Sequence, residues 1–217
     1  TWDPENIFNP NKIVDTPSMN SMLRYEPGQQ APEIKTIFHF PNQTMLQHAE
    51  QCNGSGDCRK TELSGGTMCP SYMATRNEKD TTRARANILR EFLTHSTKEN
   101  RFDHKEIYDV LDLCLACKGC KSECPSTVDM AKMKMEFLQH YYDANGVPMR
   151  ANMIGNYSKL SALAAIAPGI YNGLINNSFT GGLIRKFSGF AEKRSLPGLH
   201  SITLRKWFKE KWPKEKQ

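Results

Sequence analysis

Four cysteines in the middle of the chain have a spacing that is suited to binding a metal cluster. They follow the pattern C-x2-C-x2-C-x3-C-P and are Cys114, Cys117, Cys120 and Cys124, with Pro125 after the last. This spacing is typical of iron–sulfur ligands, because thiolates at every third residue of a short loop can face one cluster, while the fourth, before proline, binds a different cluster. One such run therefore predicts a second run in the same chain.

An altered second run comes earlier in the sequence. Cys52 and Cys58 stand six residues apart, as do the first and third cysteines of the intact run, and Ser55 occupies the middle position. The fourth position is supplied by Cys69, again followed by proline, after an insertion from Arg59 to Met68. This run is therefore one thiolate short.

Crosswise sharing between the two runs divides the cysteines into two ligand sets. The first set is a complete group of four for a [4Fe–4S] cluster: Cys69, Cys114, Cys117 and Cys120. The second set surrounds another cluster with three thiolates: Cys52, Cys58 and Cys124. The alternatives for a fourth, non-cysteine ligand of the second cluster are His48, Ser55 and Asp57.

Disulfides and structural zinc explain these cysteines less well. A disulfide framework usually has an even number of cysteines and follows a secretory signal, whereas this chain has seven cysteines and starts without a charged-then-apolar segment. Tetrahedral zinc accepts C-x2-C pairs, but it gives no reason for cysteine at every third position three times over. Iron–sulfur clusters are the favoured interpretation.

Composition predicts a protein with a modest core and no membrane span. The chain has 217 residues, 38% of them hydrophobic, and a mean hydropathy of -0.61. No apolar stretch approaches the roughly 18 residues of a membrane span, so we expect a cytoplasmic protein. The formal net charge is +6, and residues 205–217 hold six Lys or Arg against two Glu. That end is predicted to be a solvated helix or a contact with a membrane surface or an acidic partner. Nucleic-acid binding is disfavoured, because its aromatic residues belong to no RNA-binding motif.

Apolar periodicity predicts a mainly α protein with helices around the cysteines. One helix is expected to begin near Asp80, and a second, capped near Asp103, to run through Leu115 and carry Cys114 at its C-terminal end. A third is expected to start at the S-x-x-D signal Ser126 to Asp129 and to end near Asn145. Its predicted inward stripe is Val128, Ala131, Met135, Leu138 and Tyr142.

Two arginines on the first of these helices have two possible roles. Arg83 and Arg85 are either solvated or balance the negative charge of thiolate-bound clusters. The sequence alone leaves both possibilities open.

Several stretches resemble a known family. They are Cys52 to Arg59 (CNGSGDCR), Met68 to Arg76 (MCPSYMATR), Thr82 to Ala86 (TRARA) and Cys114 to Leu138 (CLACKGCKSECPSTVDMAKMKMEFL). The chain from roughly 45 to 145 thus resembles the α-helical ferredoxin module of large FAD- and iron–sulfur-containing 2-hydroxyacid dehydrogenases, such as D-lactate, glycolate and D-2-hydroxyglutarate dehydrogenases. Asp3 to Val14 (DPENIFNPNKIV) resembles the closing segment of FAD-linked oxidases of the vanillyl-alcohol-oxidase type.

This resemblance implies an architecture and a function. The architecture is mainly α: a FAD-linked oxidase tail and linker at 1–33, an α-helical ferredoxin domain with two clusters at 34–145, and a helical segment at 146–217 leading to a further domain. The implied function is electron transfer from a flavin, reduced by a 2-hydroxyacid, to a downstream acceptor. FAD would be bound by a preceding part of the same polypeptide, so this chain is expected to contain no catalytic residue of its own. The acceptor would be a cysteine-rich domain or a membrane quinone system, with the protein peripheral at the inner face of the membrane.

The missing cysteine has a parallel in a related module. Ser55 stands where iron–sulfur subunits of succinate dehydrogenase and fumarate reductase also lack a cysteine, and this resemblance implies [3Fe–4S] at Cys52, Cys58 and Cys124. Two other functions remain open: a free-standing iron–sulfur subunit of a respiratory or heterodisulfide-reductase-like complex, and clusters kept only for structure. The tail at Asp3 to Val14 favours the dehydrogenase.

Overall fold

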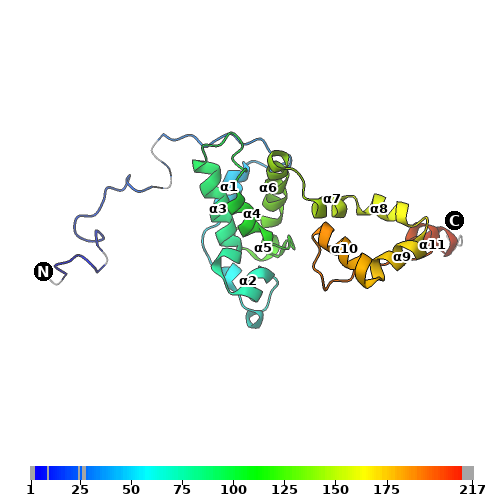
Figure 1. Cartoon of the computed structure of the whole chain (residues 1–217). Coiled ribbons are helices and arrows are strands. Elements are labelled where there is room, and N and C mark those ends of the chain that lie inside the picture. The colour runs from blue at the N-terminus through cyan, green and yellow to red at the C-terminus, as the bar shows by residue number, and fades with distance from the viewer. Residues whose placement is uncertain (1–2, 9, 24, 26–27, 212–217) are drawn as a thin grey trace, which may run out of the picture. The chain divides into compact units, whose positions relative to one another are not determined.

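The secondary structure of the chain is helical. A computed structural model describes residues 3–8, 10–23, 25 and 28–211, and no strand occurs among them. The prediction of a mainly α protein is confirmed. The sequence features near the two ends of the chain lie at Asp3 to Val14 and at residues 205–217. Of these residues, Asn9 and residues 212–217 lie outside the described residues. The helices are α1 Met45–Glu50, α2 Pro70–Thr75, α3 Thr82–His95, α4 Lys105–Asp112, α5 Gly119–Glu123, α6 Met130–Asn145, α7 Met149–Gly155, α8 Tyr157–Ala164, α9 Pro168–Asn176, α10 Ser178–Ser188 and α11 Leu204–Lys211 (Figure 1). Short 3₁₀ turns lie at Asp57–Arg59, Glu62–Ser64 and Glu78–Asp80.

The chain forms two compact units. The first unit combines the described residues of Thr1–Thr97 with Val110–Met133, and the second combines Lys98–Asp109 with the described residues of Lys134–Gln217. All seven cysteines belong to the first unit. The candidate metal chemistry is therefore confined to one compact part of the protein.

Helix α3 forms the main support of the first unit. Its N-cap is Thr81, whose hydroxyl accepts a hydrogen bond from the Ala84 N–H, so the helix begins at Thr82, two residues after the predicted Asp80. It packs against α1 (Figure 1), and Leu89 and Leu93 are fully buried. Burial of two leucine side chains contributes about 1.5–3 kcal/mol each to folding.

Helix α4 is shorter than the periodicity predicted. It ends at Asp112, so Cys114 lies in the following loop and not on the helix. Ile107 and Leu111 are fully buried as expected, but Leu115 is 71% exposed. The apolar pattern continued past the last helical residue, which is why Leu115 was wrongly placed in the core.

Helix α6 ends at Asn145, as predicted, but begins later than the start signal. Its first turn is capped by Asp129, whose Oδ1 accepts a hydrogen bond from the Lys132 N–H at 3.0 Å. Met135, predicted to face inward, is 43% exposed, while Met133 and Phe137 are fully buried. Of the predicted stripe, Val128 and Ala131 are buried as expected, Leu138 and Tyr142 are half-buried, and Met135 alone is exposed.

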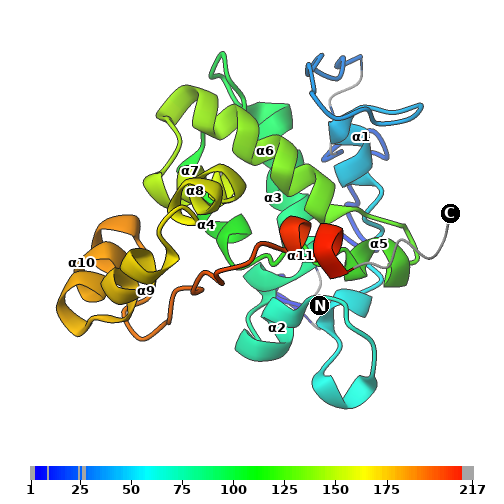
Figure 2. The ribbon, with the colours of Figure 1, turned by 90° about the vertical axis from the view of Figure 1, so that its right-hand side faces the viewer.

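The second unit contains the C-terminal helices. Helices α9 and α10 pack against each other (Figure 2), and Phe102 stacks on His140 with ring centroids 4.4 Å apart. No helix within the described ranges has both the length and the apolar character needed to cross a membrane.

Candidate iron–sulfur centre

Four cysteines from separate parts of the sequence line one cavity in the first unit. They are Cys69, Cys114, Cys117 and Cys120. These are the four residues that crosswise sharing predicts for a [4Fe–4S] cluster. Their role as ligands stays a prediction, but a common cavity is what such a role requires.

The loop from Cys114 to Cys120 turns tightly between α4 and α5. The Cys114 N–H donates to the Leu111 carbonyl at 3.0 Å, and Ala116 and Lys118 have left-handed backbones with φ of 52° and 63°. These turns keep the three thiols of the loop around one cavity. Cys120 is buried, whereas Cys117 is exposed at the edge of the site.

Gly119 permits a close approach between this loop and the segment before Cys69. A Cβ atom at Gly119 would lie 3.1 Å from the Thr67 carbonyl oxygen, tighter than ordinary van der Waals contact. Next to it, the Glu123 carboxylate accepts hydrogen bonds from the Thr67 N–H at 2.7 Å and from the Met68 N–H at 3.1 Å. A hydrogen bond from the Thr67 hydroxyl at 2.6 Å, together with these backbone bonds, holds the pKa of Glu123 below its usual range. Together they hold Cys69 beside α5.

Cys69 is a buried thiol with hydrogen-bond donors around it. Its Sγ accepts a hydrogen bond from the Thr82 N–H at 3.1 Å and lies 2.9 Å from the Thr82 hydroxyl. Burial raises the pKa of Cys69 to about 11, and the Thr82 hydrogen bonds oppose that rise. The free thiol therefore stays protonated at neutral pH, and a metal must displace its proton to bind.

The N-termini of α3 and α6 donate backbone hydrogen bonds to cysteine thiols. Backbone N–H groups of Met130 and Ala131, at the start of α6, hydrogen-bond to Cys120 and lower its pKa against the larger effect of burial. Arg83, at the start of α3, does the same for Cys58. Helix N-termini favour negative charge, so both helices stabilise thiolates at these positions.

The second predicted ligand set is brought together in part. Burial raises the pKa of Cys58, and the nearby Cys52 adds a smaller electrostatic rise. Cys124 caps the C-terminal end of α5, where its N–H donates to the Cys120 carbonyl at 3.0 Å. Its membership of this set stays a prediction.

The three alternatives for a fourth ligand differ in their surroundings. His48 is buried, its Nε2 accepts the Asp129 N–H at 2.9 Å, and its Nδ1 lies 3.0 Å from the Gln43 amide nitrogen. Burial lowers the pKa of His48, in keeping with a neutral ring that bridges two segments. Both ring nitrogens are engaged, which argues against ligation by His48. Ser55 is exposed, and Asp57 pairs with Lys60 at 3.5 Å.

The residues fit an iron–sulfur cluster in donor chemistry. Four thiols line a cavity, and backbone N–H groups at two helix starts favour the anionic forms of Cys69 and Cys120. Across the described part of the chain, no three His, Cys, Asp or Glu side chains are grouped for a single metal ion. The sequence predicted the cysteines but gave no sign of the roles of Thr82 and Glu123, which belong to no recognisable motif. Thr82 hydrogen-bonds to Cys69, 13 residues earlier, and Glu123 hydrogen-bonds to Thr67 and Met68, about 55 residues earlier.

Comparison with protein families agrees with this chemistry. Residues 51–129 match the family described as "4Fe-4S dicluster domain". This part of the chain is therefore similar to domains that hold two [4Fe–4S] clusters. The match includes all seven cysteines and the N-termini of α3 and α5.

The chain is also similar to much larger proteins named D-2-hydroxyglutarate dehydrogenase. It is 27% identical to the one from Pseudomonas putida over 88% of this chain and 22% of that protein. It is 25% identical to those from Escherichia coli, over 86% of this chain and 21% of that protein, and Pantoea ananatis, over 94% and 23%. The chain thus spans about a fifth of the length of these curated relatives. No solved structure matches it.

Proposed function

We propose that the iron–sulfur segment carries electrons from a flavin, reduced by a 2-hydroxyacid, through two clusters to a downstream acceptor. The observation that carries this proposal is the cavity shared by Cys69, Cys114, Cys117 and Cys120 within the dicluster-type segment. The names of the relatives make D-2-hydroxyglutarate the first substrate to test, ahead of D-lactate and glycolate.

Each ligand set has its own part in the proposal. The four thiols at the cavity would hold a [4Fe–4S] cluster, and Cys52, Cys58 and Cys124 would hold a [3Fe–4S] cluster. Such clusters accept and release one electron at a time, which is how a two-electron flavin reaction is connected to one-electron acceptors. The exposed Cys117 would mark the edge of the first cluster nearest to a redox partner.

The flavin would belong to the same polypeptide. In this proposal residues 1–33 close a FAD-linked oxidase domain, 34–145 form the ferredoxin-like domain and 146–217 lead to a further domain. The acceptor would be a cysteine-rich domain or a membrane quinone system.

The proposed function predicts a sharp division of activity. A polypeptide that contains this chain and its FAD region should reduce an artificial dye when given D-2-hydroxyglutarate. The 217 residues alone should bind no FAD, turn over no hydroxyacid and yet take up electrons from dithionite, because they hold only one-electron centres. Dye-reduction assays and anaerobic spectroscopy measure both.

Two outcomes would contradict it. Steady-state hydroxyacid turnover by the 217 residues would place the active site within them. Failure of the complete polypeptide with every 2-hydroxyacid, while it passes electrons from another donor, would instead favour a respiratory or heterodisulfide-reductase-like subunit.

A peripheral membrane position is part of the proposal. Residues 146–217 contain twelve Lys or Arg and three Glu, an excess of positive charge that the rest of the chain lacks. On α11, Leu204, Trp207 and Phe208 are exposed beside Lys206 and Lys209. Exposed apolar side chains mixed with cations are typical of helices that lie on anionic lipid.

Vesicle binding tests this position. The protein should sediment with vesicles containing phosphatidylglycerol, less so at high salt because salt screens the attraction, and not with pure phosphatidylcholine. The double variant Lys206→Glu/Lys209→Glu should weaken binding, whereas Lys105→Glu, an exposed lysine on α4, should weaken it less. Equal binding to both kinds of vesicle, or none to either, would refute a charge-driven membrane contact.

A further inference from the structure

Arg85 is a buried cation in the wall of the four-cysteine cavity. It lies on α3, its side chain is only 2% exposed, and it lines the same cavity as Cys69, Cys114 and Cys120. Of the two roles open for the arginines of α3, solvation is thereby excluded for Arg85. Arg83, by contrast, is partly exposed and pairs with Glu78 at 2.7 Å.

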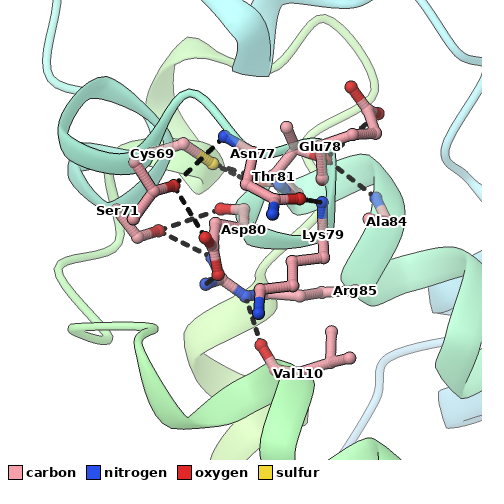
Figure 3. Close-up of polar contacts among 12 residues, drawn as sticks. Cys69, Ser71, Asn77, Glu78, Lys79, Asp80, Thr81, Ala84, Arg85 and Val110 are labelled. Carbon is pink, nitrogen blue, oxygen red and sulfur yellow. Dashed lines mark hydrogen bonds and ion pairs between the residues drawn. The ribbon is translucent and has the colours of Figure 1, made fainter.

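Hydrogen bonds hold the Arg85 guanidinium between the segments that carry the cysteines. Its Nε donates to the Val110 carbonyl at 3.0 Å, and its Nη1 donates to the Ser71 hydroxyl at 3.0 Å (Figure 3). Ser71 follows Cys69 by two residues, and Val110 lies on the helix that precedes Cys114. The charge is therefore fixed relative to cysteines from both runs.

The third nitrogen of this guanidinium lacks a hydrogen bond. Its Nη2 is buried and has no hydrogen-bond partner among the described residues. Its counter-charge is Asp80, whose Oδ1 is 3.6 Å away (Figure 3). The Oδ2 of Asp80 accepts a hydrogen bond from the Thr75 hydroxyl. A buried donor without an acceptor costs about 1–3 kcal/mol or more if charged, so it calls for a partner. The side chain that carries this donor lines the cavity of thiols.

We propose that Arg85 raises the reduction potential of the cluster held by Cys69, Cys114, Cys117 and Cys120, and that Asp80 limits this effect. The proposal rests on the cluster site proposed above. A cluster bound by four thiolates is negative and gains another negative charge when it accepts an electron. A fixed positive charge in a buried wall stabilises the reduced form more than the oxidised form, and so does a hydrogen bond to a cluster sulfur.

No proton needs to move in this step. Arginine stays protonated in proteins, so one electron enters the cluster and the charge of Arg85 is unchanged. The contribution of Arg85 to the potential should therefore not vary with pH around neutrality.

Removal of each charge in turn tests the proposal. Arg85→Gln should lower the potential of the four-iron cluster, and Asp80→Asn should raise it, because the two changes remove charges of opposite sign from neighbouring buried positions. Arg90→Gln, which removes the same charge about 7 Å further along α3, should leave the potential nearly unchanged. Anaerobic potentiometric titration followed by electron paramagnetic resonance measures each potential, on the complete polypeptide with its iron and sulfide content determined.

The outcomes separate this proposal from the proposed function. If iron and sulfide are bound but Arg85→Gln and Asp80→Asn leave the potential unchanged or shift it in the same direction, the role of Arg85 is refuted and the electron-transfer function stands. If the wild-type protein binds no cluster, the proposed function fails first. If Arg85→Gln loses its cluster, Arg85→Lys takes its place, since it keeps the charge and changes only the hydrogen bonds. Arg85→Lys should bind the four-iron cluster, and its reduction potential should stay closer to that of the wild-type protein than loss of the charge would allow. Asp80→Asn then decides, and an unchanged or lowered potential overturns the proposal.

Discussion

Cys69→Ser should remove the four-iron cluster and leave the other cluster in place. Cys69 belongs to the earlier run in sequence, but it lines one cavity with Cys114, Cys117 and Cys120. Loss of one of four thiolates removes a strong ligand from that cluster only. Iron analysis and electron paramagnetic resonance of anaerobically prepared protein would show which cluster is lost.

Cys124→Ser is the matched control for this experiment. It makes the same sulfur-to-oxygen replacement at the last cysteine of the intact run, and it should deplete the cluster of Cys52 and Cys58 while the four-iron signals persist. Should each substitution instead remove the cluster of its own sequence neighbours, crosswise sharing would be wrong. Far-ultraviolet circular dichroism should show that both variants remain folded.

Ser55→Cys should convert a three-iron centre into a four-iron centre. Ser55 occupies the position equivalent to the middle cysteine of the intact run, and it is exposed in the loop between Cys52 and Cys58. The wild-type protein should contain about seven irons per chain and show the oxidised-state signal of a three-iron centre, while the variant should contain about eight and lack that signal. A surface substitution of this kind changes folding stability by no more than about 0.5 kcal/mol in most proteins.

Ser64→Cys provides the control for an added thiol. Ser64 is also exposed, but it lies in the inserted segment before Cys69 and is not expected to reach either cluster. It should leave the iron content and the three-iron signal unchanged. If the wild-type protein already holds eight irons without a three-iron signal, then Ser55, Asp57 or a water completes the second cluster, and the vacancy does not exist.

The sequence by itself determined the class of chemistry. Thiolate spacing is a local property, since the distances within Cys114 to Cys120 depend on the few residues between them. The motif therefore predicted an iron–sulfur segment without a structure, and the family match agrees with that prediction. Helix content was equally accessible, because apolar periodicity and caps act over a few residues. Helix ends were harder to predict. The apolar pattern continued beyond the end of α4 at Asp112, so Leu115 was predicted to be buried although it is exposed.

Only the tertiary structure decided what surrounds the thiols. Cys69 meets Cys114 across 45 residues of sequence, the Glu123 carboxylate bonds to Thr67, and a histidine proposed as a ligand instead bridges two segments. Arg83 and Arg85 share one short sequence, yet one is partly exposed and the other is buried in the cavity wall. These contacts depend on how helices pack. Side chains two positions apart on a helix, such as these two arginines, point in directions about 200° apart around the helix axis. Electrostatics at the site therefore follow from packing, which no local pattern contains.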